Sequence, residues 1–276
     1  MKRILIILSL LISVAFAQSK AGFYVVGGNV ITVQDTSSRN YLKAIENAGV
    51  VPSVLQNAAS NFLVTSEKAI GSYSLMTAQY GFIGGNAATH RFNVNNPIDT
   101  DLGFRLTFSG TFAHSATGAL PTSASSTART YLNPSLNLPS QNNLHLSFFS
   151  GTNIQNSFYD ISAGAGAFRI YGNGSGFNGG NLSSSTFHQI ATTNSLGWYG
   201  INRINATQTT VFKNQTLNTI SNTSNTFANA EVILFGEGVN SSMREGRLII
   251  LGAGFTDTQL IQQSRIVTFF NSMQNR

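Results

Sequence analysis

The spacing of the apolar residues changes over residues 80–118, and this change divides the chain into two parts. Before this stretch the apolar residues recur every three or four positions, which is the period of a helix with one buried face. After it they alternate with polar residues in short runs separated by Gly, Asn, Ser and Pro, as in half-buried strands. The sequence therefore predicts a small helical segment followed by a large β body.

Two helices are predicted between residues 38 and 80. Tyr41, Leu42 and Ile45 share one helical face, and Gly49 is placed to end the first helix. Pro52 is accepted in the first turn of a second helix that continues to residue 71. The apolar stripe of this second helix comprises Val54, Leu55, Ala58, Ala59, Phe62, Leu63, Ala69 and Ile70. Each stripe needs a partner surface, and we expect the β body to provide it.

About eight strands are predicted in the β body, and residues 144–150 show the pattern most clearly. Leu144, Leu146 and Phe148 point to one side of an extended chain, whereas His145 and Ser147 point to the other. This alternation is typical of an antiparallel sheet with one face on the core and one face in water. We therefore expect a mainly β fold, built as an antiparallel β-sandwich.

The chain ends in a predicted helix after residue 256. Thr256 can cap this helix, and Gln259 can complete a capping box. Its buried side is predicted to contain Leu260, Ile261, Val267 and Phe270. The sandwich is thus expected to have a helical preface at one end and a closing helix at the other.

The first seventeen residues have the pattern of a secretory signal. Lys2 and Arg3 precede an apolar run over residues 4–14, and Ala15 and Ala17 form a small-residue cleavage pattern. The run is too short for a permanent membrane span, so we expect cleavage and export. The predicted organisation is a signal peptide (1–17), an N-terminal arm (18–37), a helical preface (38–80) and a β-sandwich domain with its closing helix (81–276).

Composition excludes some classes of site. The chain has no cysteine, so disulfides and thiolate metal sites are impossible. Its net charge is +6, but no run of Lys and Arg stands out, and we do not expect nucleic-acid binding. Only 9% of the residues are charged, which suits an exported β-rich protein whose surface is covered by Asn, Ser, Thr and Gly.

Several stretches resemble a known class of proteins. The segment GRLIILGAGFTDTQLIQQSRIVTFF resembles the last strand and closing helix of concanavalin A-like, laminin-G-type jelly-roll domains. The order of YGFIGG, THRFNVNNPIDTD, FRLTFSGTFAHSATG, NLHLSFF and GWYGINR is similar to virion-surface (tail or fibre) proteins of Bacteroidetes phages and prophages. The resemblance covers the chain from about residue 41 onward. It implies a jelly-roll recognition module that binds a cell-surface glycan or receptor, and partners among other virion or envelope proteins.

No catalytic residue, cofactor or metal is predicted. Sandwich glycanases use paired carboxylates on one strand face, whereas Glu231, Glu237 and Glu245 are separated by turns or strand lengths. The four histidines lack the close pairing of zinc ligands, and His114 beside Ser115 is interpreted as structural.

Two further patterns are weak. Asp99 and Asp101 could offer oxygens to calcium, but two acids are few for an ion that takes 6–8 ligands, and local turn bonds are favoured. Gly174, Gly176 and Gly179 match a dinucleotide-binding pattern, yet the residues that follow are strand-like, so a hairpin loop is favoured.

The predicted ligand-binding residues gather around this glycine-rich loop and on one later strand. Exposed aromatic rings stack on sugar faces while nearby amides bind hydroxyl groups. The set is Tyr171, Asn173, Phe177, Asn178, His188 and Trp198. Trp198 and Tyr199 are neighbours in a strand, so only one of them faces outward, and a core position for Trp198 remains the favoured alternative.

Three functions follow from these patterns. The first is an exported, non-enzymatic recognition module for a cell-surface glycan or receptor, located outside the cell or on a virion. The second is a structural virion or envelope protein without a small ligand. The third is a secreted enzyme that cleaves glycans.

Overall fold

The computed structural model describes residues 34–156, 158–164, 168–172, 177–184, 186–192, 194–225, 227–237 and 240–275, with only the backbone for residue 177. It also gives the backbone of the antiparallel pair β1 (Phe23–Val26) and β2 (Asn29–Thr32), within the predicted arm. The predicted signal peptide lies outside the described residues. Among the described residues, no helix has both the length and the apolar character needed to cross a membrane.

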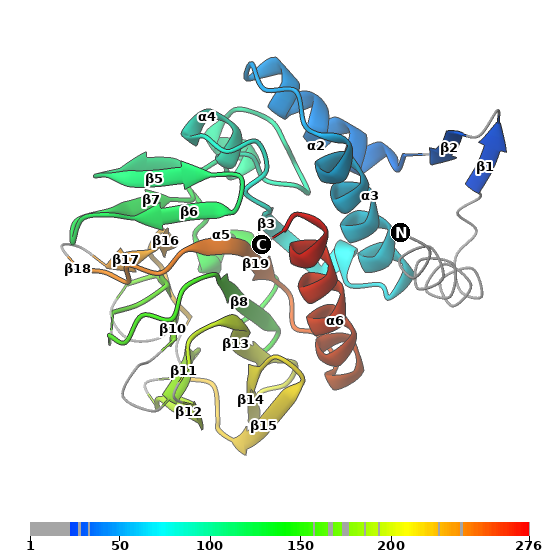
Figure 1. Cartoon of the computed structure of the whole chain (residues 1–276). Coiled ribbons are helices and arrows are strands. Elements are labelled where there is room, and N and C mark those ends of the chain that lie inside the picture. Colours follow the sequence, from blue (N-terminus) through cyan, green and yellow to red (C-terminus); the bar gives the residue numbers. More distant parts are fainter. Residues whose placement is uncertain are drawn as a thin grey trace.

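Two antiparallel sheets form the body (Figure 1). In the larger sheet the strands follow the order β15 (Thr216–Ser221), β14 (Gln208–Lys213), β13 (Gly197–Arg203), β8 (Leu144–Ser150), β19 (Gly246–Gly252), β6 (Gly118–Pro121) and β5 (Phe112–Ser115). In the smaller sheet the order is β12 (His188–Ala191), β11 (Phe177–Leu182), β10 (Phe168–Gly172), β9 (Ile161–Ser162), β16 (Ile233–Leu234), β7 (Thr127–Arg129) and β4 (Thr107–Ser109). The mainly β, antiparallel prediction is confirmed, and the fold is a jelly-roll-like β-sandwich.

Three long helices cover the outer face of the larger sheet, and Figure 1 shows α3 and α6 side by side. They are α2 (Thr36–Asn47), α3 (Val54–Ala69) and α6 (Asp257–Met273). Ser53 caps α3 in a capping box with Gln56. The predicted box of Thr256 and Gln259 caps α6 and is confirmed. Short elements complete the fold: η1 (Tyr73–Leu75), α4 (Ala87–His90), η2 (Asp101–Gly103), α5 (Pro134–Asn137), β17 (Gly236–Glu237) and β18 (Asn240–Ser241).

The central strands of the larger sheet are buried on both faces. Leu146, Phe148 and Ile201 face the core between the two sheets. Trp198 and Leu248 face a second core beneath the helices. The strands β8, β13, β14 and β19 therefore contribute residues to two hydrophobic clusters, which requires apolar or hydrogen-bonded side chains on both sides.

The expectation that His145 and Ser147 lie on a solvated face is wrong. Both are fully buried, because the helices cover that face of β8. The His145 ring stacks on Phe255 with 4.1 Å between ring centroids. Its Nδ1 lies 3.2 Å from Asn202 Oδ1 and its Nε2 lies 2.9 Å from Ser147 Oγ, so both ring nitrogens have partners without a charge.

The last part of the predicted helical preface is a strand. β3 (Met76–Tyr80) pairs antiparallel with β19 and joins the larger sheet. Gln79 on this strand donates its amide to the buried Glu67 of α3 at 2.6 Å. The preface is therefore bonded into the sandwich by its backbone as well as packed on it.

A buried ion pair crosses the interior of the sandwich. Arg244 Nη1 lies 3.1 Å from Asp160 Oδ1, and both side chains are fully buried. The Tyr199 hydroxyl donates to Asp160 Oδ2 at 2.7 Å, and Arg244 also donates to the Asn156 and Phe158 carbonyls. Both charges in this cluster thus have hydrogen-bond partners, and a buried charge without such partners would strongly destabilise the fold.

Candidate ligand-binding pocket

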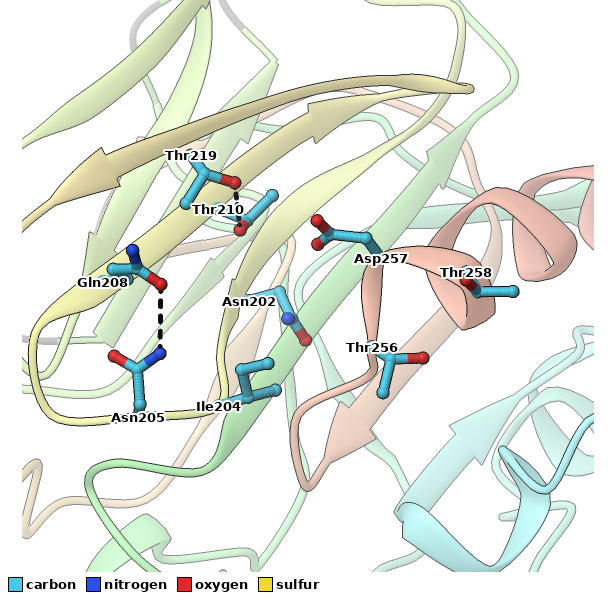
Figure 2. A pocket seen from close by; sticks show the side chains of 9 residues that line it. All are labelled: Asn202, Ile204, Asn205, Gln208, Thr210, Thr219, Thr256, Asp257 and Thr258. Atoms are coloured by element: carbon cyan, nitrogen blue, oxygen red, sulfur yellow. Dashed lines mark hydrogen bonds between the residues drawn. The ribbon is translucent and has the colours of Figure 1, made fainter.

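A pocket of about 200 Å³ opens where the first turn of α6 meets the outer face of β13, β14 and β15 (Figure 2). Further along these strands the helix covers the sheet, but beside its first turn Gln208 and Thr219 are exposed, whereas Asn202 and Thr210 are buried. The lining residues are Asn202, Ile204, Asn205, Gln208, Thr210, Thr219, Thr256, Asp257 and Thr258. All except Ile204 are polar, so the pocket is lined by hydrogen-bonding groups with one apolar contact.

Asn202 joins the strand side of the pocket to the helix side. Its Oδ1 accepts from the Phe255 N–H at 2.8 Å, and its Nδ2 donates to the Phe255 carbonyl at 2.8 Å. Asn202 and Phe255 are both buried, and Phe255 immediately precedes the Thr256 cap of α6. These two bonds fix the start of the helix against β13, so Asn202 is a positioning residue for the pocket.

Internal bonds use some of the polar groups in the pocket. Thr210 and Thr219 bond to each other at 2.9 Å across β14 and β15, and Asn205 Nδ2 donates to Gln208 Oε1 at 3.2 Å. Thr256 is engaged in its capping box. Figure 2 draws the two side-chain pairs as dashed lines.

Other groups in the pocket remain available. The Gln208 amide nitrogen donates to no other side chain in the described part of the chain, and the Asp257 carboxylate accepts from none. Figure 2 shows the Asp257 side chain extending from the start of α6 toward Thr210 on β14. A ligand in the pocket would therefore meet an anionic acceptor on one side and an amide donor on the other. Hydroxyl groups are matched to this combination because they both donate and accept.

The sequence-predicted ligand residues lie elsewhere. Tyr171 is half-buried in the smaller sheet and stacks on Phe187, with 4.8 Å between centroids and 13° between planes. Asn173 lies outside the described residues, as does the side chain of Phe177. The role of Tyr171 in binding stays a prediction.

The expectation that Asn178 and His188 are exposed is wrong, because their exposures are 1% and 5%. Trp198 is 0% exposed, which confirms the favoured alternative of a core position. Asn178 shares a strand face with Leu182, which points into the core between the sheets, and His188 pairs with Gly180 on that same face. Trp198 faces the helices, where Phe212 packs on its ring with 4.5 Å between centroids. Strand alternation thus turns all three inward.

Asp257 and Gln208 are outside the sequence-predicted ligand residues. Local patterns indicate only a helix start at Asp257 and a strand of the sandwich at Gln208. β14 begins with three consecutive polar residues, Gln208, Thr209 and Thr210, so its sequence does not show which face is open. Nothing in the sequence indicates that the first turn of α6 lies beside them.

The other chemical candidates are engaged within the fold. His114 Nδ1 contacts His90 Nδ1 at 3.0 Å, while the Ser115 hydroxyl bonds to Thr117, so His114 and Ser115 do not form a catalytic pair. Burial lowers the pKa of His114. Within the described residues, no group of three or more His, Asp or Glu side chains could hold a metal ion.

The acidic candidates are engaged in ion pairs. Asp99 pairs with Arg91 and Arg105, and Asp101 pairs with Arg105. The glutamates of the glycanase alternative each pair with a different arginine: Glu231 with Arg129, Glu237 with Arg169, and Glu245 with Arg247. These pairs provide a structural role for each acid.

No family model matches the chain, and no curated protein matches it significantly. Domain 4 of AbnA, an extracellular arabinanase from Geobacillus stearothermophilus solved with arabinotriose, is similar in structure. The identity is 16%, the match covers 69% of this chain and 98% of that one, and the TM-score is 0.46.

Two other solved structures are similar to a comparable degree. The binding domain of botulinum neurotoxin serotype D is 12% identical, with 70% of this chain and 52% of that one covered and a TM-score of 0.46. Trypanosoma rangeli sialidase is 8% identical, with 83% and 38% covered and a TM-score of 0.46. The chain thus spans about half of the toxin domain and less of the sialidase. Similarities of this size do not indicate a shared ligand.

Proposed function

We propose that the chain is an exported recognition module that binds a hydroxyl-rich ligand, a cell-surface glycan, in the pocket of Figure 2 without cleaving it. One observation carries the proposal: a polar pocket in which the Asp257 carboxylate and the Gln208 amide remain available to a ligand. Small-molecule sites combine a concave shape with a few directed polar groups, and this pocket has both.

The chemistry of the pocket favours binding over cleavage. Glycoside hydrolysis uses two carboxyl groups on either side of the scissile bond. Asp257 is the one acid among the nine residues that line the pocket. One carboxylate can accept hydrogen bonds from hydroxyl groups, but it does not supply an acid and a nucleophile together.

Export and a place on a virion or cell surface are parts of the same proposal. The signal pattern of residues 1–17 supports export. The resemblance of the later motifs to virion-surface proteins supports attachment as the role of the module. A glycan partner is consistent with both.

The test is a glycan array together with a whole-cell binding assay, using residues 18–276. The pocket variant is Gln208→Ala, and the matched control is Gln189→Ala, an exposed glutamine on β12 of the other sheet. We expect binding by the wild type and the control, and about tenfold weaker binding by Gln208→Ala, the size expected for one lost hydrogen bond. Absence of binding to glycans and cells would contradict the proposal. Release of reducing sugar would contradict its non-enzymatic part.

A further inference from the structure

The acidic side chains of this protein are almost all neutralised within the fold. The chain has ten Asp and Glu residues, and all ten lie in the described part. Eight of them form ion pairs with Lys or Arg: Asp35, Glu46, Asp99, Asp101, Asp160, Glu231, Glu237 and Glu245. A ninth, Glu67, is buried and accepts hydrogen bonds from the amides of Gln79 and Gln263.

Asp257 differs from the other nine. Within the described residues, its carboxylate forms no ion pair and accepts no hydrogen bond from another side chain. It is exposed, and it lines the pocket. Among the described residues, Asp257 is therefore the one acid that lines this pocket, and its carboxylate forms no ion pair there.

Capping of α6 does not account for Asp257. Thr256 and Gln259 already form a complete capping box at this helix start, with bonds from the Gln259 N–H to Thr256 Oγ1 and from the Thr256 N–H to Gln259 Oε1. A carboxylate in the first turn does interact favourably with the helix dipole. That interaction would be equally satisfied by a side chain directed to solvent, whereas the Asp257 side chain extends toward Thr210 across the pocket (Figure 2).

We infer that Asp257 determines the specificity of the pocket, selecting an uncharged sugar residue with adjacent hydroxyl groups over an acidic sugar. This inference rests on the proposed glycan-binding function. The two oxygens of the carboxylate accept hydrogen bonds from two neighbouring hydroxyls, and such charge-assisted bonds are about twice as strong as neutral ones.

The same carboxylate disfavours acidic sugars. A sugar carboxylate in a pocket of about 200 Å³ would lie close to Asp257, and like charges at that range repel strongly. None of the nine lining residues is Lys or Arg, so the pocket wall offers no compensating cation. Gln208, Asn205 and the threonines are neutral, so they can form hydrogen bonds with the hydroxyl groups of neutral and acidic sugars alike.

The experiment compares matched probes that differ at C6, where the neutral sugar has a hydroxymethyl group and the acidic sugar has a carboxylate. Glucose and galactose conjugates are immobilised beside glucuronic acid and galacturonic acid conjugates. Affinities are measured for the wild type, Asp257→Asn and Glu46→Gln. The last variant removes the same charge from an exposed position on α2 and serves as the matched control.

We expect the wild type and Glu46→Gln to bind the neutral conjugates at least tenfold more tightly than the acidic ones. Asp257→Asn should bind the neutral conjugates about 10- to 100-fold more weakly. The ratio of its affinities for neutral and acidic conjugates should fall toward one. Equal wild-type affinity for both classes, or an unchanged preference in Asp257→Asn, would overturn the inference while leaving glycan binding intact. Failure of the wild type to bind any conjugate or cell would instead reject the proposed function.

Discussion

Glu67 should make the stability of the fold fall as the pH rises. Its side chain is fully buried between α3, β3 and α6, where Oε1 accepts from Gln79 Nε2 at 2.6 Å and from Gln263 Nε2 at 2.7 Å. Burial disfavours the charged form and raises the pKa of Glu67 to about 8, against the opposing effect of the two amide donors. The folded protein therefore keeps a proton that the unfolded chain releases near pH 4.5.

The size of the effect follows from this difference in pKa. The stabilising contribution of the protonated group is fully present below pH 4.5 and is lost progressively as the pH rises to about 8. Each pH unit in this window lowers the free energy of unfolding by about 1.4 kcal/mol, or roughly 5 kcal/mol over the whole window. Glu67→Gln keeps the shape of the side chain and its acceptor oxygen but has no proton to lose.

The assay is urea denaturation at several pH values between 5 and 8, followed by the fluorescence of Trp198, the single tryptophan. Other groups titrate in this range, but their contributions cancel in the difference between the variant and the wild type. We expect Glu67→Gln to gain stability relative to the wild type by about 1.4 kcal/mol per pH unit. Glu46→Gln, at an exposed position, should show no such slope. If the difference in free energy of unfolding between Glu67→Gln and the wild type does not change from pH 5 to 8, the reasoning is refuted.

Three further predictions concern buried polar groups, and each is measured by urea denaturation. Asn202→Leu leaves the Phe255 N–H and carbonyl without partners, which should cost about 2–5 kcal/mol of stability; a loss below 1 kcal/mol would contradict this. Arg244→Met leaves Asp160 as an unpaired buried charge and should cost about 3–5 kcal/mol, much of which the added change Asp160→Leu should restore. Burial lowers the pKa of His145 to about 3, so the neutral ring stabilises the fold fully above pH 6.5, and this stabilisation should be lost as the pH falls toward 3. His145→Gln should remove this part of the pH dependence of the free energy of unfolding.

Local patterns in the sequence were sufficient to predict most of the fold. The capping box at Thr256 and Gln259 and the alternation of Leu144, Leu146 and Phe148 depend on residues close in the chain. Such signals predicted the closing helix and the antiparallel sandwich, and the helices of the preface follow from the same kind of spacing. These predictions are confirmed because they depend on spacing within one element and not on which elements lie beside it.

Long-range arrangement was harder to predict. The strand β3 falls within the predicted helical preface (38–80), because its five residues carry no sign that β19 lies beside them. His145 and Ser147 were assigned to water because the alternation of a strand does not show that helices cover its second face. Both errors have the same cause: the partner of a surface lies far away in the sequence.

The candidate pocket was missed for this reason too. Its walls come from three strands and from the start of a helix about forty residues later in the chain. The sequence-predicted ligand residues include Trp198, which lies in the helix-side core. An acid without a partner, such as Asp257, can be recognised only after every ion pair has been assigned in three dimensions.

The most direct test of the whole account is a crystal structure of the protein with a neutral sugar that it binds. We predict that the sugar lies in the pocket at the start of α6, with two hydroxyl groups within hydrogen-bond distance of the Asp257 carboxylate and another near the Gln208 amide. A sugar bound at a different surface, for example beside Tyr171, with the pocket at Asp257 empty, would contradict the account.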